Sequence, residues 1–367
     1  MVETAQDAPA RVVIDLPHRR GGHCGTGSFR DLLEYHALGY GAEPLSESMV
    51  LGLSGSLTFL FAQQAAPPDA PGLQLPLYMN GRSEDLESRF CANVGIGLDL
   101  RRTDDSGEAW AWLRDELTAG RPTMVWANIG DLDYLDVKLD NTRHDVIVTG
   151  FDLDAGVAFL ADYDRDELEP CALDSLARAR ASSAFPGPAR NATWVMRFPE
   201  RLPEPGVVVR VAIESVVRNM CRPRDPALPY GEGLCAVREL AESYRDWPER
   251  FGGELRSVLK LLHVLIDRAG TGGSLFRRFF ARFLAEAAEL TGDRSLEGPA
   301  AAYDELADAW AELSRTVRRG TPHAHEAGID CVERVAVLEA RGVRRLRGWL
   351  DLSAPPEPAL DHGEVPV

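Results

Sequence analysis

The pattern of hydrophobic and polar positions divides the chain into two parts of different character. Roughly the first 205 residues mix short apolar runs of β type with turns and amphipathic helices. Three of these runs are 122–128, 144–152 and 156–164. A short turn, 152–156, separates the last two, so they predict a β-hairpin.

An amphipathic helix is predicted just before these strands. Trp110, Leu113 and Leu117 recur at helical spacing and form an apolar stripe. The polar segment 104–106 is typical of a helix start, and Gly120 is typical of a helix stop.

The second part reads as helical throughout. A linker with three prolines, 199–206, precedes it. Apolar residues at three-to-four spacing then predict helices at 207–221, 232–247, 252–268, 273–291, 298–319 and 324–349. The pattern predicts three segments: a first domain over 1–205, a helical domain over 206–353 and a disordered Pro-rich tail over 354–367.

Composition and charge exclude several classes of protein. The chain has 45% hydrophobic and 26% charged residues, as ordinary globular proteins do. The net charge of −17 argues against nucleic acid or an anionic membrane as a partner. Residues 1–205 hold 18 basic and 32 acidic residues (−14), and the rest hold 22 and 25 (−3). The acidity is therefore concentrated in the first part, which suits a cationic substrate.

Targeting and redox signals point to the cytoplasm. We expect neither a signal peptide nor a transmembrane helix, because no basic start with an apolar run and no apolar stretch of 18 residues occurs. The six cysteines are scattered without a CxxC pair, which is typical of a reduced protein. No Cys or His pair has zinc-ligand spacing, so no metal site is expected.

The segment 20–40, RGGHCGTGSFRDLLEYHALGY, carries the clearest chemical signal. Cys24 stands just before an amphipathic helix, where the helix dipole and free N–H groups favour a thiolate. Glycines such as Gly25 surround it, so the backbone there can bend and approach a ligand. The local sequence fits an inert buried cysteine equally well.

A nucleophilic cysteine needs a base, and the base needs an orienting group. His144 opens one strand of the predicted hairpin, and Asp162 lies at the end of the other. Neighbouring antiparallel strands would bring these side chains together at one rim of the sheet. Each is ordinary alone, but with Cys24 they form an ordered Cys–His–Asp set.

This order, together with HDVIVTGFD and AFLADYD, resembles the papain-like superfamily, including the bacteriocin-processing cysteine peptidases. A wider set of motifs is similar to the butirosin biosynthesis acyltransferase family: GHCGTGSFRDLLEYHALGYGAEPLSESMVLGLSGSLTF, HDVIVTGFD, GTGGSLFRRFFARFLAEAAEL and DELADAWAEL. The resemblance implies an α+β, papain-like cysteine-peptidase fold with a C-terminal all-helical domain. It also implies that Cys24, His144 and Asp162 form the catalytic set.

The family's founding activity moves an aminoacyl group from an acyl carrier protein to the amine of an aminoglycoside. The resemblance therefore implies a cysteine-dependent acyltransferase of antibiotic biosynthesis, with an acyl carrier protein and a small amine-bearing acceptor as partners. No cofactor is expected beyond the phosphopantetheine of the donor, and a homodimer is left open. The same three residues would also serve a thioester hydrolase or peptidase, an amide-forming cyclase or, without catalysis, a binding module.

Further candidate contacts carry weaker signals. His23 is expected to be structural or to touch substrate, since adjacent residues in a turn point apart. Ser46 is expected to be an N-cap, with Glu47 or Ser54 as a ligand contact. Gly272 precedes a predicted helix whose N-terminus could cradle the donor's phosphate, although a plain turn with an N-cap at Thr271 or Ser274 is the preferred interpretation. Arginines on the second part form either ordinary solvated faces, which is the default interpretation, or docking surfaces for an acidic carrier. They are Arg277, Arg278, Arg282, Arg315, Arg318, Arg319, Arg344, Arg345 and Arg347.

Overall fold

The protein has two antiparallel sheets, described here from a computed structural model that covers residues 9–63, 75–228, 230–269 and 271–352. The larger sheet has the strand order β4-β9-β5-β6-β7-β8, and β1 pairs with the far end of β6. Its strands are β1 (Arg11–Val13), β4 (Gly97–Arg101), β5 (Thr123–Ala127), β6 (His144–Asp152), β7 (Val157–Ala161), β8 (Glu169–Ala172) and β9 (Thr193–Arg197). The predicted hairpin is confirmed, because β6 and β7 are antiparallel neighbours.

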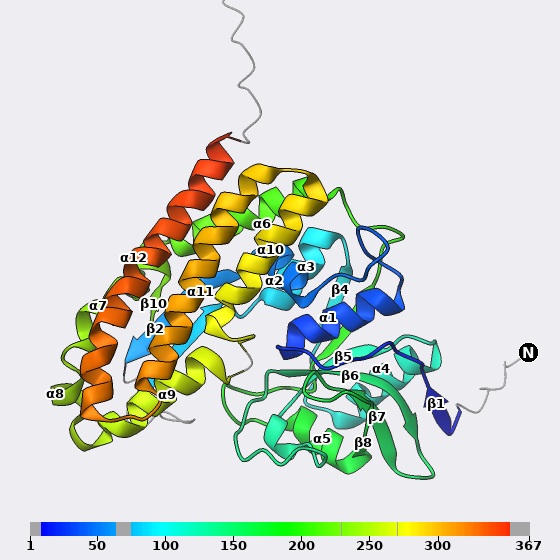
Figure 1. The fold of residues 1–367 in the computed structure, drawn as a ribbon. Coiled ribbons are helices and arrows are strands. Elements are labelled where there is room, and N and C mark those ends of the chain that lie inside the picture. Colours follow the sequence, from blue (N-terminus) through cyan, green and yellow to red (C-terminus); the bar gives the residue numbers. More distant parts are fainter. Residues whose placement is uncertain (1–8, 64–74, 229, 270, 353–367) are drawn as a thin grey trace, which may run out of the picture.

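Helices cover both faces of this sheet because successive strand residues point to opposite sides. Val125 and Val148 pack in one cluster with Leu113 of α4, and Met124 and Ile147 belong to the other cluster, which contains α1. The helices of this part are α1 (Cys24–Tyr35), α2 (Glu47–Ser54), α3 (Leu86–Val94), α4 (Ser106–Thr118) and α5 (Leu173–Ala181). Figure 1 shows α1 lying along the sheet beside β5 and β6.

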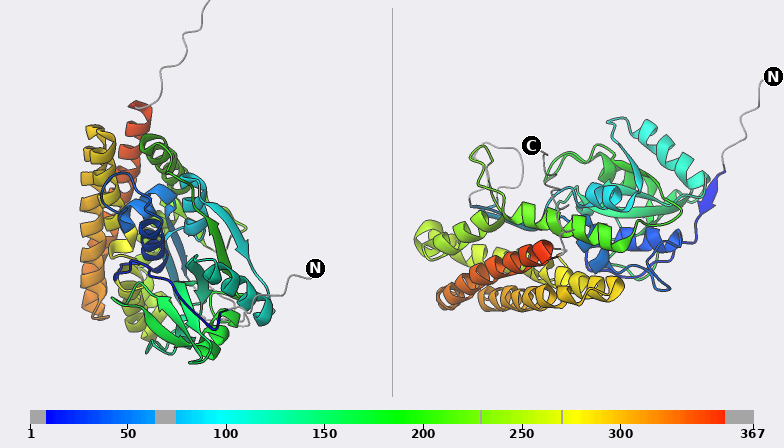
Figure 2. Two further views of the ribbon diagram at one scale, coloured as in Figure 1. Left: turned by 90° about the vertical axis from the view of Figure 1, so that its right-hand side faces the viewer. Right: turned by 90° about the horizontal axis from the view of Figure 1, so that it is seen from above.

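The second part of the chain is helical apart from one two-residue strand, as far as the structure describes it. Its helices are α6 (Pro205–Met220), α7 (Gly233–Tyr244), α8 (Trp247–Phe251), α9 (Leu255–Asp267), α10 (Arg277–Thr291), α11 (Glu297–Val317) and α12 (Pro322–Leu352). All six predicted helices are present. In Figures 1 and 2, α10, α11 and α12 form a layer on one side of the molecule.

The smaller sheet joins the two parts. It has the order β10-β2-β3, with strands β2 (Leu57–Gln63), β3 (Leu77–Arg82) and β10 (Gly231–Glu232). One apolar core runs from Leu16 to Trp349 and includes residues of both parts. The division at residue 205 stays a prediction, and the expected disordered tail, 354–367, lies outside the described residues.

Candidate active site

Cys24 is the first residue of α1 and is only 9% exposed. His23 caps the helix: its backbone is extended, and its Nδ1 accepts the N–H of Thr26 at 3.2 Å. The sulfur therefore lies at a helix N-terminus, where the dipole and the free N–H groups favour negative charge.

His144 and Asp162 lie together at one rim of the large sheet. His144 opens β6, and Asp162 directly follows the last residue of β7, its antiparallel neighbour. The His144 Nε2 is 2.9 Å from the Asp162 Oδ2, and both side chains are almost fully buried. The hydroxyl of Tyr134 donates to the same carboxylate oxygen at 2.7 Å. Because Nε2 is bound to Asp162, Nδ1 is the ring atom left to exchange a proton with Cys24.

The charges in this cluster favour a thiolate beside an imidazolium. Burial disfavours ionisation of Cys24, but the imidazoles of His23 and His144 outweigh it and hold the pKa of the thiol well below its usual value. Burial opposes protonation of His144, yet Asp162 and Cys24 raise the pKa of the imidazole well above its usual value. Burial likewise disfavours the Asp162 carboxylate, and the charge of His144 with its hydrogen bond lowers the pKa of that group.

Two buried carboxyl groups lie on another side of Cys24, and sequence reasoning missed both. The Asp145 Oδ2 is 3.8 Å from the Cys24 sulfur. A Cβ placed on Gly25 would be 2.7 Å from Glu87 Oε1 and 3.1 Å from Asp145 Oδ2, so both groups face this glycine. Arg82 lies 3.7 Å from Glu87. Burial first, then the charges of Glu87 and Cys24, raise the pKa of Asp145 well above its usual value.

The signal for Asp145 was its place next to His144. Strand alternation would point two successive residues to opposite faces, so only one of them would be expected beside Cys24. In the structure, the side chains of His144 and Asp145 both approach Cys24. Glu87 stands on α3, and nothing local in its sequence marks it.

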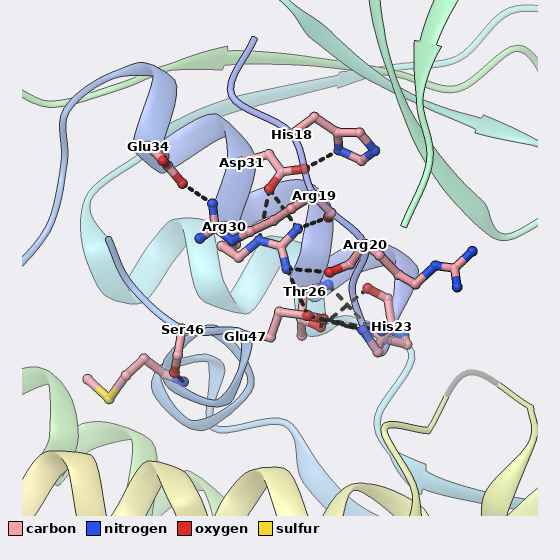
Figure 3. A network of polar contacts seen from close by, with 12 residues as sticks. His18, Arg19, Arg20, His23, Thr26, Arg30, Asp31, Glu34, Ser46 and Glu47 are labelled. Carbon is pink, nitrogen blue, oxygen red and sulfur yellow. Dashed lines mark hydrogen bonds and ion pairs between the residues drawn. The ribbon is translucent and has the colours of Figure 1, made fainter. Parts of the chain in front are cut away.

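Glu47 holds the loop before the nucleophile in place (Figure 3). Its carboxylate accepts the N–H groups of Gly22 and His23 and the hydroxyl of Thr26, and it pairs with Arg30 at 3.0 Å. These contacts make Glu47 a scaffold residue for the Cys24 loop rather than a group aimed at a ligand.

Two other predicted contact residues, Ser54 and Gly272, pack against other parts of the fold. The hydroxyl of Ser54 donates to Leu51 within α2 and is also 2.7 Å from the hydroxyl of Ser56, while Ser46 caps α2 as predicted. Gly272 lies against the ring of Phe279 and beside the loop before Cys24, because a Cβ placed on Gly22 would be 3.5 Å from the Gly272 Cα. The helix α10 begins only at Arg277. The α-helix therefore starts five positions after Gly272, with a turn between them.

The expected docking surface on α10 also needs correction. Arg277 is fully buried and pairs with Glu339, so it cannot meet a carrier. Arg278 pairs with Asp304 and Asp308 of α11. Helical periodicity did not reveal the burial of Arg277, because a charged residue in a buried ion pair has the same sequence pattern as one on a solvent-exposed helix face.

Comparison with known families finds one match in each part of the chain. Residues 23–163 match the family described as butirosin biosynthesis protein H, N-terminal. The match begins one residue before Cys24 and ends one residue after Asp162, so it spans the whole cluster described above. The family's name implies a biosynthetic enzyme.

Residues 174–346 match a domain of unknown function, DUF4872. No curated protein matches the chain. Within the described ranges, no helix is both long and apolar enough to traverse a bilayer. The same residues bring no three His, Cys, Asp or Glu side chains into a metal-binding group.

Proposed function

We propose that the chain is a cysteine-dependent acyltransferase of natural-product biosynthesis that moves an acyl or aminoacyl group from a carrier-protein thioester to an amine. The supporting observation is that Cys24, at the start of α1, shares one buried cluster with the His144–Asp162 pair. A helix that begins with the nucleophile, beside a sheet rim that carries the base and its orienting group, is also what a papain-like fold requires.

In the first half-reaction the Cys24 thiolate attacks the carbonyl carbon of the thioester. The new C–S bond forms as the bond to the carrier's sulfur breaks, and the leaving thiolate takes a proton from the His144 imidazolium. Asp162 holds the imidazole by its Nε2 and stabilises the charged form. The described residues offer no acceptor to the N–H of Cys24, so this group is available to the developing oxyanion.

In the second half-reaction an amine attacks the acyl-enzyme. Its nitrogen forms the amide bond, its proton passes to His144, and the C–S bond to Cys24 breaks. The thiolate and the imidazolium are then restored. The proposed reaction needs neither a metal nor an organic cofactor.

Two features favour transfer to an amine over hydrolysis. Cys24, His144 and Asp162 are all nearly closed off from solvent, which limits the access of water to an acyl-enzyme. Asp145, beside the sulfur, and Glu87, beside Gly25, place carboxyl oxygens near the nucleophile, and these can accept hydrogen bonds from an amine-bearing acceptor.

Intact-mass spectrometry with an acylated carrier protein tests this function. We expect an acyl adduct on the parent protein, its loss in Cys24→Ala and its retention in Cys91→Ala, a matched change at another buried cysteine. Added amine should release the adduct as an amide.

The products distinguish the alternatives. Release by water alone would indicate a hydrolase, and release of a ring by the chain's own amine would indicate a cyclase. An adduct that persists in Cys24→Ala would contradict the assignment of the nucleophile.

A further inference from the structure

His23 is held in one tautomer. Its Nδ1 accepts the backbone N–H of Thr26, so that nitrogen carries a lone pair and the ring proton lies on Nε2. The ring is buried, with 4% of its surface exposed. The cap contact therefore leaves a single N–H, directed away from the helix backbone.

That N–H faces the nucleophile. The His23 Nε2 is 4.0 Å from the Cys24 sulfur, which is too long for a strong hydrogen bond to the resting thiol. At this separation, an atom that is bonded to the same carbon as the sulfur can lie between the sulfur and Nε2 and accept the N–H. The oxygen of a carbonyl under attack by the sulfur would be such an atom, within the roughly 2.7–3.1 Å at which oxyanion donors act.

A turn from the second part of the chain also contacts the ring of His23. The rings of Phe276 and His23 meet edge to face, with centroids 5.1 Å apart and planes at 82°. Residues 272–276 all have positive φ, and three of them, Ser274, Leu275 and Phe276, are not glycine. Such strained conformations persist only where surrounding contacts enforce them, and they are common at active sites.

Arg277 supplies those contacts. Its guanidinium donates to the carbonyl oxygens of Leu275 and Gly81 and pairs with Glu339 at 2.8 Å, all in the fully buried interior. Gly81 has to be glycine, because a Cβ there would lie 2.3 Å from the Leu275 oxygen. Through Arg277, the turn 272–276 is therefore connected to β3 by a hydrogen bond and to α12 by an ion pair.

We propose that His23 donates its Nε2–H to the carbonyl oxygen of the acyl group as Cys24 attacks, and that Phe276, in the turn 272–276, holds the ring in position. In this step the C–S bond forms, the electron pair of the C=O bond moves to oxygen, and His23 gives a hydrogen bond but keeps its proton. This assigns a role to the domain of unknown function, which completes the site. The proposal rests on the proposed acyl transfer.

Two substitutions at His23 separate its two contacts. His23→Asn keeps a side-chain acceptor for the N–H of Thr26 but removes the donor next to the sulfur. His23→Gln places an amide N–H at a similar reach but loses the Nδ1 acceptor. Acylation of Cys24 by 4-nitrophenyl acetate passes through an oxyanion, whereas alkylation by iodoacetamide does not. Both rates are taken from the plateaus of their pH profiles, so that a change in thiolate fraction does not enter.

We expect His23→Asn to slow acylation by about 10²–10³-fold relative to alkylation, and His23→Gln to recover part of that loss. Acylation at the parent rate in His23→Asn, or equal slowing of both reactions, would show that His23 is only a helix cap. If the parent itself is alkylated at Cys24 but never acylated there, acyl transfer is wrong and this role falls with it.

Phe276→Ala tests the positioning. We expect the ratio of acylation to alkylation to fall, because the ring of His23 loses its support. Phe280→Ala is the matched control: it removes an equally buried phenylalanine of α10 that contacts Tyr303 rather than His23. An equal ratio in the two variants would overturn the role of Phe276.

Discussion

At the scale of single residues, the surroundings of the six cysteines differ sharply. Burial raises the pKa of Cys91 and of Cys171 to about 12, with further contributions from Glu87 and Asp133 respectively. Around Cys24 two imidazoles reverse the effect of burial and lower the thiol pKa. Since the thiolate is the reactive form, the same degree of burial should give opposite reactivity.

We therefore predict that iodoacetamide near pH 7 modifies Cys24 first and leaves Cys91 and Cys171 unmodified for orders of magnitude longer. Peptide mapping after timed quenching measures this order. Cys221 is exposed and serves as an internal reference for accessibility. Faster labelling of Cys221 than of Cys24 would count against an activated thiol.

Asp162 should set the upper pH limit of the reaction. Its negative charge raises the pKa of His144, so Asp162→Asn should let the imidazolium lose its proton at lower pH. The alkaline limb of the acylation rate, measured with an acyl thioester, should then move to lower pH. Asp164→Asn, an exposed neighbour, is the control.

The reduction in acylation rate should also differ between substitutions of His144 and Asp162. His144→Ala removes the proton acceptor and should cost about 10²–10⁴-fold. Asp162→Asn should cost less, because orientation is partly replaceable. A larger loss in Asp162→Asn than in His144→Ala would reverse these assigned roles.

At the scale of elements, the start of α1 depends on a carboxylate from α2. Glu47 satisfies two backbone N–H groups of the loop before Cys24 and shares the buried Arg30 with Asp31, which pairs with it at 2.8 Å. An unpaired buried charge is costly, so this contact both stabilises the fold and orients the nucleophile.

We predict that Glu47→Gln lowers the free energy of unfolding by about 2–4 kcal/mol, because Arg30 is left with less compensating charge. Urea denaturation measures it, and the alkylation rate of Cys24 should fall as its loop loosens. Glu43→Gln, an exposed change of the same type nearby, should do neither. Equal stability of the two variants would show that Glu47 is not the support of this loop.

At the scale of the whole molecule, one buried ion pair links several distant segments. Glu339 of α12 accepts from Arg277 and from the indole N–H of Trp310 on α11, and Arg277 also reaches the backbone of β3. Both charged side chains have no solvent exposure. The pair therefore ties the C-terminal helices to the smaller sheet.

Removing the charge of Glu339 should weaken this link. Glu339→Gln leaves the Arg277 guanidinium buried without a counter-charge, which should cost about 3–5 kcal/mol in urea denaturation. Glu333→Gln, on the same helix, breaks only an exposed pair with Arg245 and should change little. Similar midpoints for the two variants would contradict a structural role for the buried pair.

Most of the elements could be predicted from the sequence because their signals are local. The stripe of Leu113 and Leu117, the cap at Ser46 and the hairpin of β6 and β7 follow from spacing and turn chemistry. The closeness of His144 and Asp162 also followed, since adjacent antiparallel strands leave their ends few other positions. These features could be predicted because each depends on residues that are close together in the sequence.

The tertiary structure alone decided what surrounds the nucleophile. Glu87, Asp145 and Phe276 reach the Cys24 region from three separate elements, and Arg277 is buried although it sits in a basic stretch. A sequence pattern records the period of one helix or strand, but not which partner covers its polar face. These contacts join residues more than fifty positions apart, so only the packing of the whole chain determines them.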